Sequence, residues 1–253
     1  MTDSHRWAFV TAGEGAMRQL PLGIRLRDAA TFANFVAGAN AEVLRHLRAR
    51  DKEATGRGIY LWGAQGAGKT HLLQAVCHAG SANGETVAYI PLSEVGTLDP
   101  ACLEGLETMH CVCLDDVHAI AGSAAWEAAV FHLYNRVVSA GGRLVVSASR
   151  APAHLGIVMP DLATRLGWGL ALRLEVLTDE EKSAALQQRG VQRGLELGPQ
   201  VADYLLRHCS RDMTDLFRLL DDLDRASLAA QRRLTIPFVK ETLSALKAVK
   251  RET

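Results

Sequence analysis

The sequence predicts an α/β fold: a parallel five-stranded sheet with helices on both faces and a phosphate-binding loop, followed by a small all-helical domain. Short apolar segments alternate with helical patterns over the first two thirds of the chain, which is typical of a parallel sheet. A glycine-rich loop ending in a lysine and a threonine follows the first apolar segment. Near Leu177 the alternation stops, and only helical periodicity follows.

The strands are expected in five short apolar runs: 58–62, 86–90, 111–114, 144–148 and 170–174. We expect Pro91 to end the second strand. Helical spacing of apolar residues predicts helices over 40–50, 71–79 and 126–139. Asp99 followed by Pro100 predicts a short helix with a side-chain cap.

The all-helical part begins at Thr178, because Thr178 and Glu181 have the spacing of a capping box. Three further helices are expected at 199–209, 213–229 and 237–249. The chain is therefore divided into a tail (1–25), an α/β domain (26–176) and a helical domain (177–253).

Composition limits the function classes. The 28 basic and 28 acidic residues give zero net charge, so we expect any contact with nucleic acid to use a local patch or a partner. Aromatic residues make up 6%, which argues against a stacking platform for single strands. No apolar run approaches the length of a membrane span, and residues 1–10 lack the apolar segment of a signal peptide. We expect a cytoplasmic protein with reduced cysteines.

The glycine-rich loop has the Walker A pattern G-x-x-x-x-G-K-T, and it consists of Gly63, Ala64, Gln65, Gly66, Ala67, Gly68, Lys69 and Thr70. Its backbone N–H groups are expected to surround the phosphates of ATP or ADP. Lys69 is expected to reach the terminal phosphates and Thr70 to ligate Mg²⁺, while His71 follows in the first turn of a helix. A strand before and a helix after the loop give the context that this chemistry needs.

The third strand runs into Asp115 and Asp116, as in a Walker B motif. Asp115 is expected to hold the Mg²⁺ shell, and Asp116 lies where a base would orient an attacking water. Cys111 and Cys113 alternate along the same strand, with His110 and His118 nearby. A metal site is conceivable there, but small buried side chains are the favoured interpretation.

Several segments carry a family resemblance. Residues 31–40, 63–73, 113–122 and 160–170 resemble the AAA+ domain of the bacterial replication initiator DnaA. Residues 126–137, 220–241 and 19–24 resemble more closely the Hda family, which consists of smaller regulatory homologues of DnaA. The similarity covers nearly the whole chain after residue 15 and implies an AAA+ domain followed by a helical lid.

The resemblance implies roles for matching residues. Arg165 matches the arginine finger, which meets the γ-phosphate bound by a neighbouring molecule. Ser147 and Ser149 lie in the sensor 1 region, and the choice between them stays open. The segment containing Phe35, Val36 and Asn40 borders the adenine pocket in DnaA-like proteins, with a core or capping role as the alternative for each. The sensor 2 arginine of the family falls on Thr214, and Arg211 or Arg218, one turn away on either side, could substitute for it, so nucleotide contact from the lid stays open.

The tail contains a peptide that resembles the sliding-clamp-binding motif of bacteria, with Gln19, Leu20, Leu22 and Ile24 at the matching positions. Leu22 and Ile24 would fill an apolar pocket, and Gln19 would form hydrogen bonds at its rim. The pattern alone is weak, and its alternative is a stretch of chain that packs on the core.

The resemblance implies a regulator that binds ADP or ATP with Mg²⁺ and is held by the DNA-loaded sliding clamp. It would stimulate hydrolysis of DnaA-bound ATP and so prevent re-initiation of replication, reaching DNA mainly through the clamp. Intrinsic hydrolysis and a homodimer are left open. The helix at 237–249 nearly ends the sequence where DnaA continues into its DNA-binding domain, and 91–110 is short for DnaA's helical insertion, so an initiator is not expected. The alternative is a DnaC-like helicase loader, for which the tail of 1–25 is short.

Overall fold

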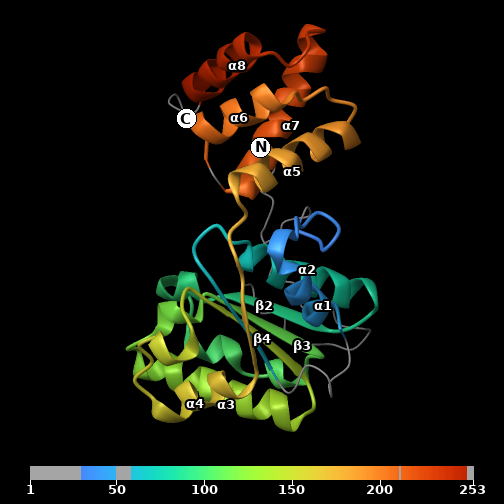
Figure 1. The fold of residues 1–253 in the computed structure, drawn as a ribbon. Helices are drawn as coiled ribbons and strands as arrows, with labels where there is room; N and C mark the ends of the chain where they lie inside the picture. The colour runs from blue at the N-terminus through green and yellow to red at the C-terminus, as the bar shows by residue number, and fades with distance from the viewer. Residues whose placement is uncertain (1–29, 50–57, 211, 250–253) are drawn as a thin grey trace, which may run out of the picture. The chain divides into compact units, whose positions relative to one another are not determined.

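The computed structural model describes residues 30–49, 58–210 and 212–249 (Figure 1). The clamp-peptide residues 19–24 therefore lie outside the described residues. The chain forms two compact units and passes from one to the other between Val176 and Leu177. The first unit contains the sheet, and the second contains only helices among its described residues.

The sheet has five parallel strands in the order β2-β3-β4-β1-β5, which confirms the predicted fold class. Each strand lies within one residue of a predicted run; the strands are β1 (Ile59–Trp62), β2 (Val87–Pro91), β3 (Cys111–Asp115), β4 (Arg143–Ala148) and β5 (Leu170–Arg173). All five strands therefore run in the same direction, and their carboxyl ends lie together. We call this end of the sheet the carboxyl edge and the opposite end the amino edge.

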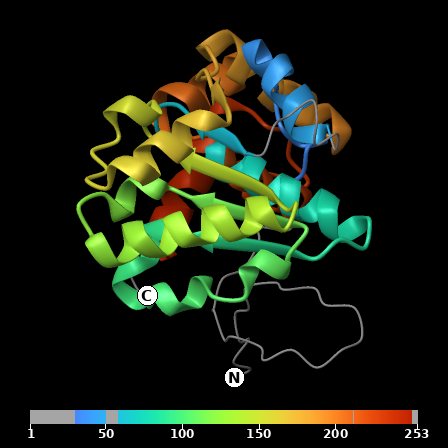
Figure 2. The same ribbon diagram turned by 90° about the horizontal axis from the view of Figure 1, so that it is seen from below.

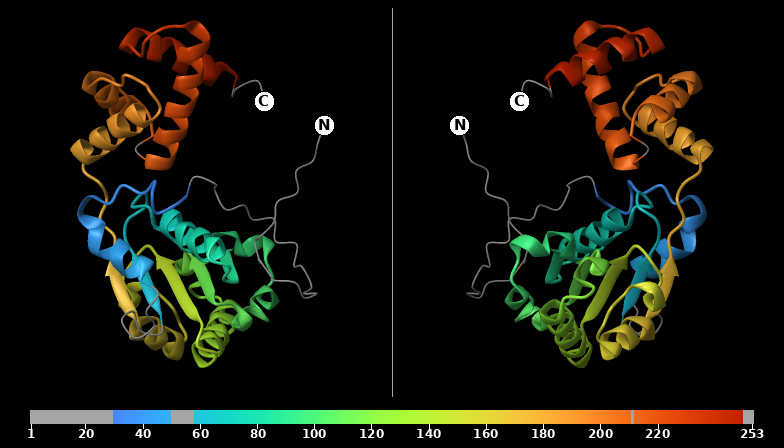
Figure 3. Two further views of the ribbon diagram at one scale, coloured as in Figure 1. Left: turned by 90° about the vertical axis from the view of Figure 1, so that its right-hand side faces the viewer. Right: turned by 90° about the vertical axis from the view of Figure 1, so that its left-hand side faces the viewer.

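Helices cover both faces of the sheet, as Figures 2 and 3 show. The α-helices of this unit are α1 (Ala41–Arg48), α2 (Lys69–Ala82), α3 (Ala124–Ser139) and α4 (Pro160–Trp168). The 3₁₀ helices are η1 (Gly38–Asn40), η2 (Leu92–Thr97), η3 (Pro100–Leu103), η4 (Leu106–Thr108), η5 (Val117–Ile120) and η6 (Pro152–His154). Helices α1 and α2 pack in one apolar cluster with the sheet, and α3 and α4 pack in another.

The second strand ends at Pro91 as predicted, and Pro91 is itself the last residue of β2, which is tolerated because β2 is an edge strand and needs fewer N–H donors. Helix α4 was not predicted as a helix, because its nine residues bury only Leu162 and Leu166 and leave a weak apolar pattern. The predicted cap of the short helix is confirmed, since Asp99 Oδ1 accepts a hydrogen bond from the Ala101 N–H at 2.8 Å.

The cysteines of β3 are core residues. Cys111 and Cys113 are buried in the cluster formed with α2, together with Cys77. A hydrogen bond with Cys113 and burial raise the pKa of the Cys111 thiol well above its usual range. Their burial agrees with the interpretation as small core side chains.

The second unit consists of α5 (Asp179–Gln192), α6 (Pro199–His208), α7 (Met213–Ala230) and α8 (Ile236–Val249). The predicted capping box is present: the Glu181 N–H donates to Thr178 Oγ1 at 3.2 Å, and the Thr178 N–H donates to Glu181 Oε2 at 2.8 Å. These helices pack around an apolar core that includes Leu205, Leu216, Leu220, Leu223 and Val239. Within the described ranges, every helix is too short or too polar to cross a membrane.

A buried carboxylate fastens the segment that leads into α4. Glu127 on α3 is only 1% exposed, and it accepts hydrogen bonds from three backbone N–H groups. Gly122 donates at 2.7 Å, Val158 at 3.1 Å and Met159, the residue before α4, at 2.7 Å. Burial alone would raise the pKa of Glu127, but these three donors hold the pKa below its ordinary value. The start of α4 is thus tied to α3 by charge-assisted hydrogen bonds.

We predict that Glu127→Gln lowers the free energy of unfolding at pH 7 by about 1–3 kcal/mol, because the amide cannot satisfy all three donors. A carboxylate with a lowered folded-state pKa stabilises the fold above its unfolded-state pKa, about 4.3, and loses this effect as the pH falls through the folded-state value. Urea unfolding from pH 7 to pH 3 should therefore show the difference shrinking in acid. Glu104→Gln, at an exposed position, is the control; a gap that stays constant with pH would contradict the assignment.

Two leucines of α7 provide a second test, of the packing in the helical unit. Leu220 is fully buried, whereas Leu228 is 71% exposed on the same helix. Leu220→Ala should lower the free energy of unfolding of this unit by about 2–5 kcal/mol through lost burial and a cavity. Leu228→Ala should change it by less than about 0.5 kcal/mol. Denaturation followed by helical circular dichroism measures both, and equal effects would show that the core is assigned wrongly.

Candidate nucleotide-binding site

The phosphate loop follows β1 and can be built only with glycine at two of its positions. A Cβ atom at Gly63 would lie 2.4 Å from the Leu174 carbonyl oxygen, and one at Gly68 would lie 2.7 Å from the Phe35 ring. Gly68 also has a φ of +96°, which residues other than glycine rarely adopt. Helix α2 begins directly after it without a side-chain cap, so its first N–H groups are not used by a capping residue. Such a loop and helix start form a suitable cradle for phosphate.

Lys69 lies over the loop with its ammonium group held by backbone. It is 8% exposed, and Nζ donates to the carbonyl oxygens of Gly63 at 2.9 Å and Ala64 at 3.0 Å. Burial lowers the pKa of Lys69, while the carboxylates of Asp116 and Asp115 act in the opposite direction. A buried cation that depends on two carbonyl groups and nearby acids is well placed to attract a polyphosphate.

Asp115 is the last residue of β3, which β4 separates from β1, and its carboxylate is held by two hydroxyl groups. It is 2% exposed; Ser147 Oγ donates to Oδ1, and the Tyr89 hydroxyl donates to Oδ2 at 2.7 Å. Burial is the main cause that raises the pKa of Tyr89, so its proton stays in place for this hydrogen bond. Asp115 is therefore fixed at the carboxyl edge of the sheet, and its carboxylate oxygens are the type of ligand that suits a Mg²⁺ shell.

Asp116 adopts a left-handed conformation, with φ of 58° and ψ of 49°, which turns the chain away from the strand. Its N–H donates to Ser147 Oγ at 2.9 Å, so Ser147 contacts both acids. Burial and then the charge of Asp115 raise the pKa of Asp116, opposed by His118 and Lys69. A carboxyl group with a raised pKa beside a phosphate loop has the properties of a general base.

Between the two candidate sensor 1 residues, the structure brings Ser147 to the acids. Ser147 is fully buried in β4, between β3 and β1 in the sheet. Ser149 lies just past the end of β4 and is partly exposed. Tyr89 was missed by sequence reasoning, although its position in β2, two residues before the partner of Asp115, could have indicated it.

The segment that was expected to border the adenine pocket lies against the loop. The Phe35 ring is 5.5 Å from the His71 ring and packs on Gly68, while Val36 is partly buried. Asn40 directly precedes α1, but its side chain forms no capping hydrogen bond there. Its side chain instead donates from Nδ2 to the Glu175 carbonyl at 2.9 Å and accepts the Glu175 N–H on Oδ1 at 2.8 Å. The capping alternative is thus wrong for Asn40, because its amide is used to hold the end of the first unit.

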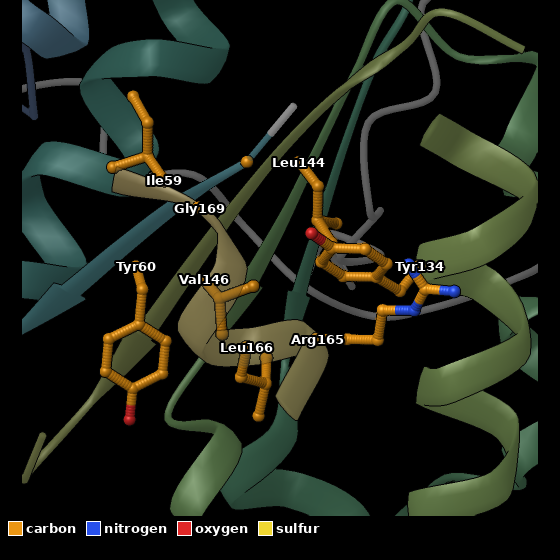
Figure 4. A pocket seen from close by; sticks show the side chains of 9 residues that line it. Ile59, Tyr60, Tyr134, Leu144, Val146, Arg165, Leu166 and Gly169 are labelled. Atoms are coloured by element: carbon orange, nitrogen blue, oxygen red, sulfur yellow. The ribbon is translucent and has the colours of Figure 1, made fainter. Parts of the chain in front are cut away.

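Arg165 lies at the opposite edge of the sheet. It is on α4, which leads into β5, and the first residue of β5, Leu170, pairs with the first residue of β1, Ile59. The phosphate loop follows the last residue of β1, about 10–13 Å further along the strand. Figure 4 shows the Arg165 side chain beside Tyr134 of α3, at a small pocket also lined by Leu144. Arg165 therefore points away from the phosphate loop of its own chain.

Arg165 is partly exposed, and its guanidinium lies over an aromatic ring. Its Cζ atom is 4.2 Å from the ring centroid of Trp168, one helical turn further along α4. Across the described ranges, no acidic side chain forms an ion pair with it. Sequence reasoning missed Trp168, although an aromatic residue three positions after an arginine on a helix is a recognisable signal.

On the helical unit, Thr214 lies in the first turn of α7. Of the two arginines that could replace the sensor 2 residue, Arg218 pairs with Asp215 at 3.8 Å on the same helix, and Arg211 lies outside the described residues.

Comparisons with known proteins agree with this architecture. The solved structure of domain III of DnaA from Thermotoga maritima is 20% identical, with a TM-score of 0.68, covering 87% of this chain and 98% of that chain. AMPPCP-bound DnaA from Aquifex aeolicus is 23% identical, with a TM-score of 0.63, covering 78% of this chain and 66% of that chain. The RuvB Holliday junction branch migration motor of Thermotoga maritima is 16% identical, with a TM-score of 0.63 over 87% of this chain and 73% of that chain. At these identities the solved structures show a shared fold.

Family models identify the chain more closely. The bacterial DnaA ATPase domain matches residues 26–95 and 102–173, which is more than half of the chain. The Hda lid domain matches residues 179–243, in the helical unit. Together with the phosphate loop, the paired acids and the parallel sheet, these matches show that the chain belongs to the DnaA family of AAA+ proteins and carries an Hda-type lid.

Proposed function

We propose that this chain is a regulatory inactivator of DnaA. It binds ADP or ATP with Mg²⁺ at Gly63–Thr70, with Thr70 and Asp115 as the residues that hold the metal. Through residues 19–24 it docks on the sliding clamp loaded on DNA, and it places Arg165 at the ATP of a DnaA molecule. Hydrolysis of that ATP prevents re-initiation of replication. We place this activity in the cytoplasm.

The position of Arg165 is the observation that carries the proposal. A guanidinium at the amino edge of the sheet cannot reach a nucleotide at the carboxyl edge of the same sheet, but it can meet one bound by a neighbour. No described acid neutralises it, and its N–H groups can pair with phosphate oxygens. Such an arginine supplied in trans can accelerate hydrolysis by about 10³–10⁵-fold.

The chain's own nucleotide site serves as a structural support in this proposal. Lys69 and Asp115 are buried charges whose surroundings suit a bound polyphosphate and metal. A ligand that binds only the folded state stabilises it, so nucleotide keeps the α/β unit in its active shape. The clamp adds a second, weak contact, and two linked contacts raise the local concentration of Arg165 near DnaA.

Arg165→Ala should reduce the hydrolysis of DnaA-bound ATP by about 10³-fold in the presence of clamp loaded on DNA, because the transition state loses its in-trans cation. Release of labelled phosphate from purified DnaA measures this. Arg173→Ala is the matched control: Arg173 is an exposed arginine in the same unit, paired with Glu175 at 3.1 Å, and its loss should leave the rate unchanged.

Nucleotide affinity distinguishes loss of the finger from loss of the site. Lys69→Ala should weaken binding of a fluorescent ADP analogue by more than about tenfold, whereas Arg165→Ala should leave it unchanged. Full hydrolysis with Arg165→Ala would contradict the proposed function. Fast ATP turnover by the chain alone, together with helicase binding, would favour a helicase loader instead.

The tail peptide is tested separately. Replacing Gln19 and Leu22 together with alanine should weaken retention on immobilised clamp by more than about tenfold, because the peptide loses its apolar anchor and its polar contact. Met17→Ala, just outside the motif, is the control. Unchanged retention of the double variant would remove the tethering step while leaving the role of Arg165 intact.

A further inference from the structure

Trp168 is the largest apolar side chain left exposed among the described residues. It is 66% exposed at the end of α4, whereas Trp126 of the same unit is 6% exposed in the core. A ring this exposed contributes little hydrophobic stabilisation, so burial does not explain a tryptophan at this position. Its one described ring contact is the Arg165 guanidinium, at 4.2 Å from the ring centroid.

A guanidinium that lies over a ring can pack by its face and keep its N–H edge free for other partners. An aromatic ring attracts the cation through its π-electrons, whereas a carboxylate would occupy the same N–H donors that a phosphate needs. Arg173 shows the contrast: it pairs with Glu175 at 3.1 Å, and its Cζ lies 5.5 Å from the Trp62 ring. Arg165 has the closer ring and no described acid, so its orientation is restricted while its donors stay available.

The backbone at this point fixes where the ring lies. Gly169 follows Trp168, and a Cβ atom there would lie 2.3 Å from the Gly58 carbonyl oxygen, so only glycine allows the approach. The next residue, Leu170, donates its N–H to the same carbonyl at 2.9 Å. Leu166, on the helix between Arg165 and Trp168, is buried at 3% exposure. The helix end that carries Trp168 is thus attached to the start of β1 on one side and to the core on the other.

We propose that Trp168 is a positioning residue for Arg165: it holds the guanidinium by its face and presents the N–H edge to a triphosphate bound by another AAA+ molecule. The inference rests on the in-trans role proposed for Arg165. Pre-orientation removes part of the entropy cost of bringing a flexible arginine to the reacting phosphate, so it acts on the rate of hydrolysis rather than on partner affinity.

The test compares Trp168→Leu, which keeps apolar area without a ring, with Trp168→Phe, which keeps a ring. Single-turnover hydrolysis of DnaA-bound ATP at saturating regulator, with clamp and DNA, should fall by about 3- to 10-fold with Trp168→Leu and recover largely with Trp168→Phe. The affinity for DnaA and the affinity for ADP should stay unchanged. Val158→Ala, which alters a 73% exposed apolar residue next to the other end of α4, should leave the rate unchanged.

A double-mutant cycle separates this inference from the proposed function. If Arg165→Ala does not lower the rate, the proposed function fails. If Arg165→Ala lowers it and Trp168→Leu alone has no effect or increases it, the positioning role fails. Trp168→Leu should add nothing in the Arg165→Ala background; an equal loss there, or a loss of DnaA affinity without a loss of rate, would show that the ring acts as partner surface and would overturn the inference.

Discussion

Parallel pairing of β1 with β4 and β5 is the constraint on which the other features depend. In-register parallel strands have a carboxyl edge and an amino edge, and every loop belongs to one or the other. The phosphate loop and the acids of β3 gather at the carboxyl edge. Arg165 precedes β5 and is therefore assigned to the amino edge. The separation of the two chemistries follows from topology, and no side chain has to enforce it.

The carboxyl edge concentrates charge that would be costly without partners. Asp115 and Lys69 are nearly inaccessible to water, and each is held by nearby polar groups: two hydroxyls from the sheet for the acid and two carbonyls of the phosphate loop for the cation. Tyr89 and Ser147 come from strands on either side of β3, so the acid is held on both sides only when β2, β3 and β4 are paired. Pairing of these strands therefore also positions the side chains around Asp115.

The sequence allowed the fold class, the five strands, the capping box and the phosphate loop to be predicted, because each has a local signal. Contacts between distant segments could not be predicted in this way. Asn40 with Glu175 and Tyr89 with Asp115 join residues far apart in the chain, and one sequence contains no spacing that reports such a pair. Helix α4 was missed because nine residues with two buried leucines give little periodicity. Ser147 and Ser149 could be separated only once the direction of each side chain was known.

The pair of hydrogen bonds between Asn40 and Glu175 has a mechanical consequence. They fix the backbone just before the junction between the units, and the capping box fixes Thr178 just after it. Val176 and Leu177 are left as the two residues whose torsion angles neither device restrains. The backbone between these two sets of hydrogen bonds is thus only two residues long, so each unit holds its own end of the connection up to the junction.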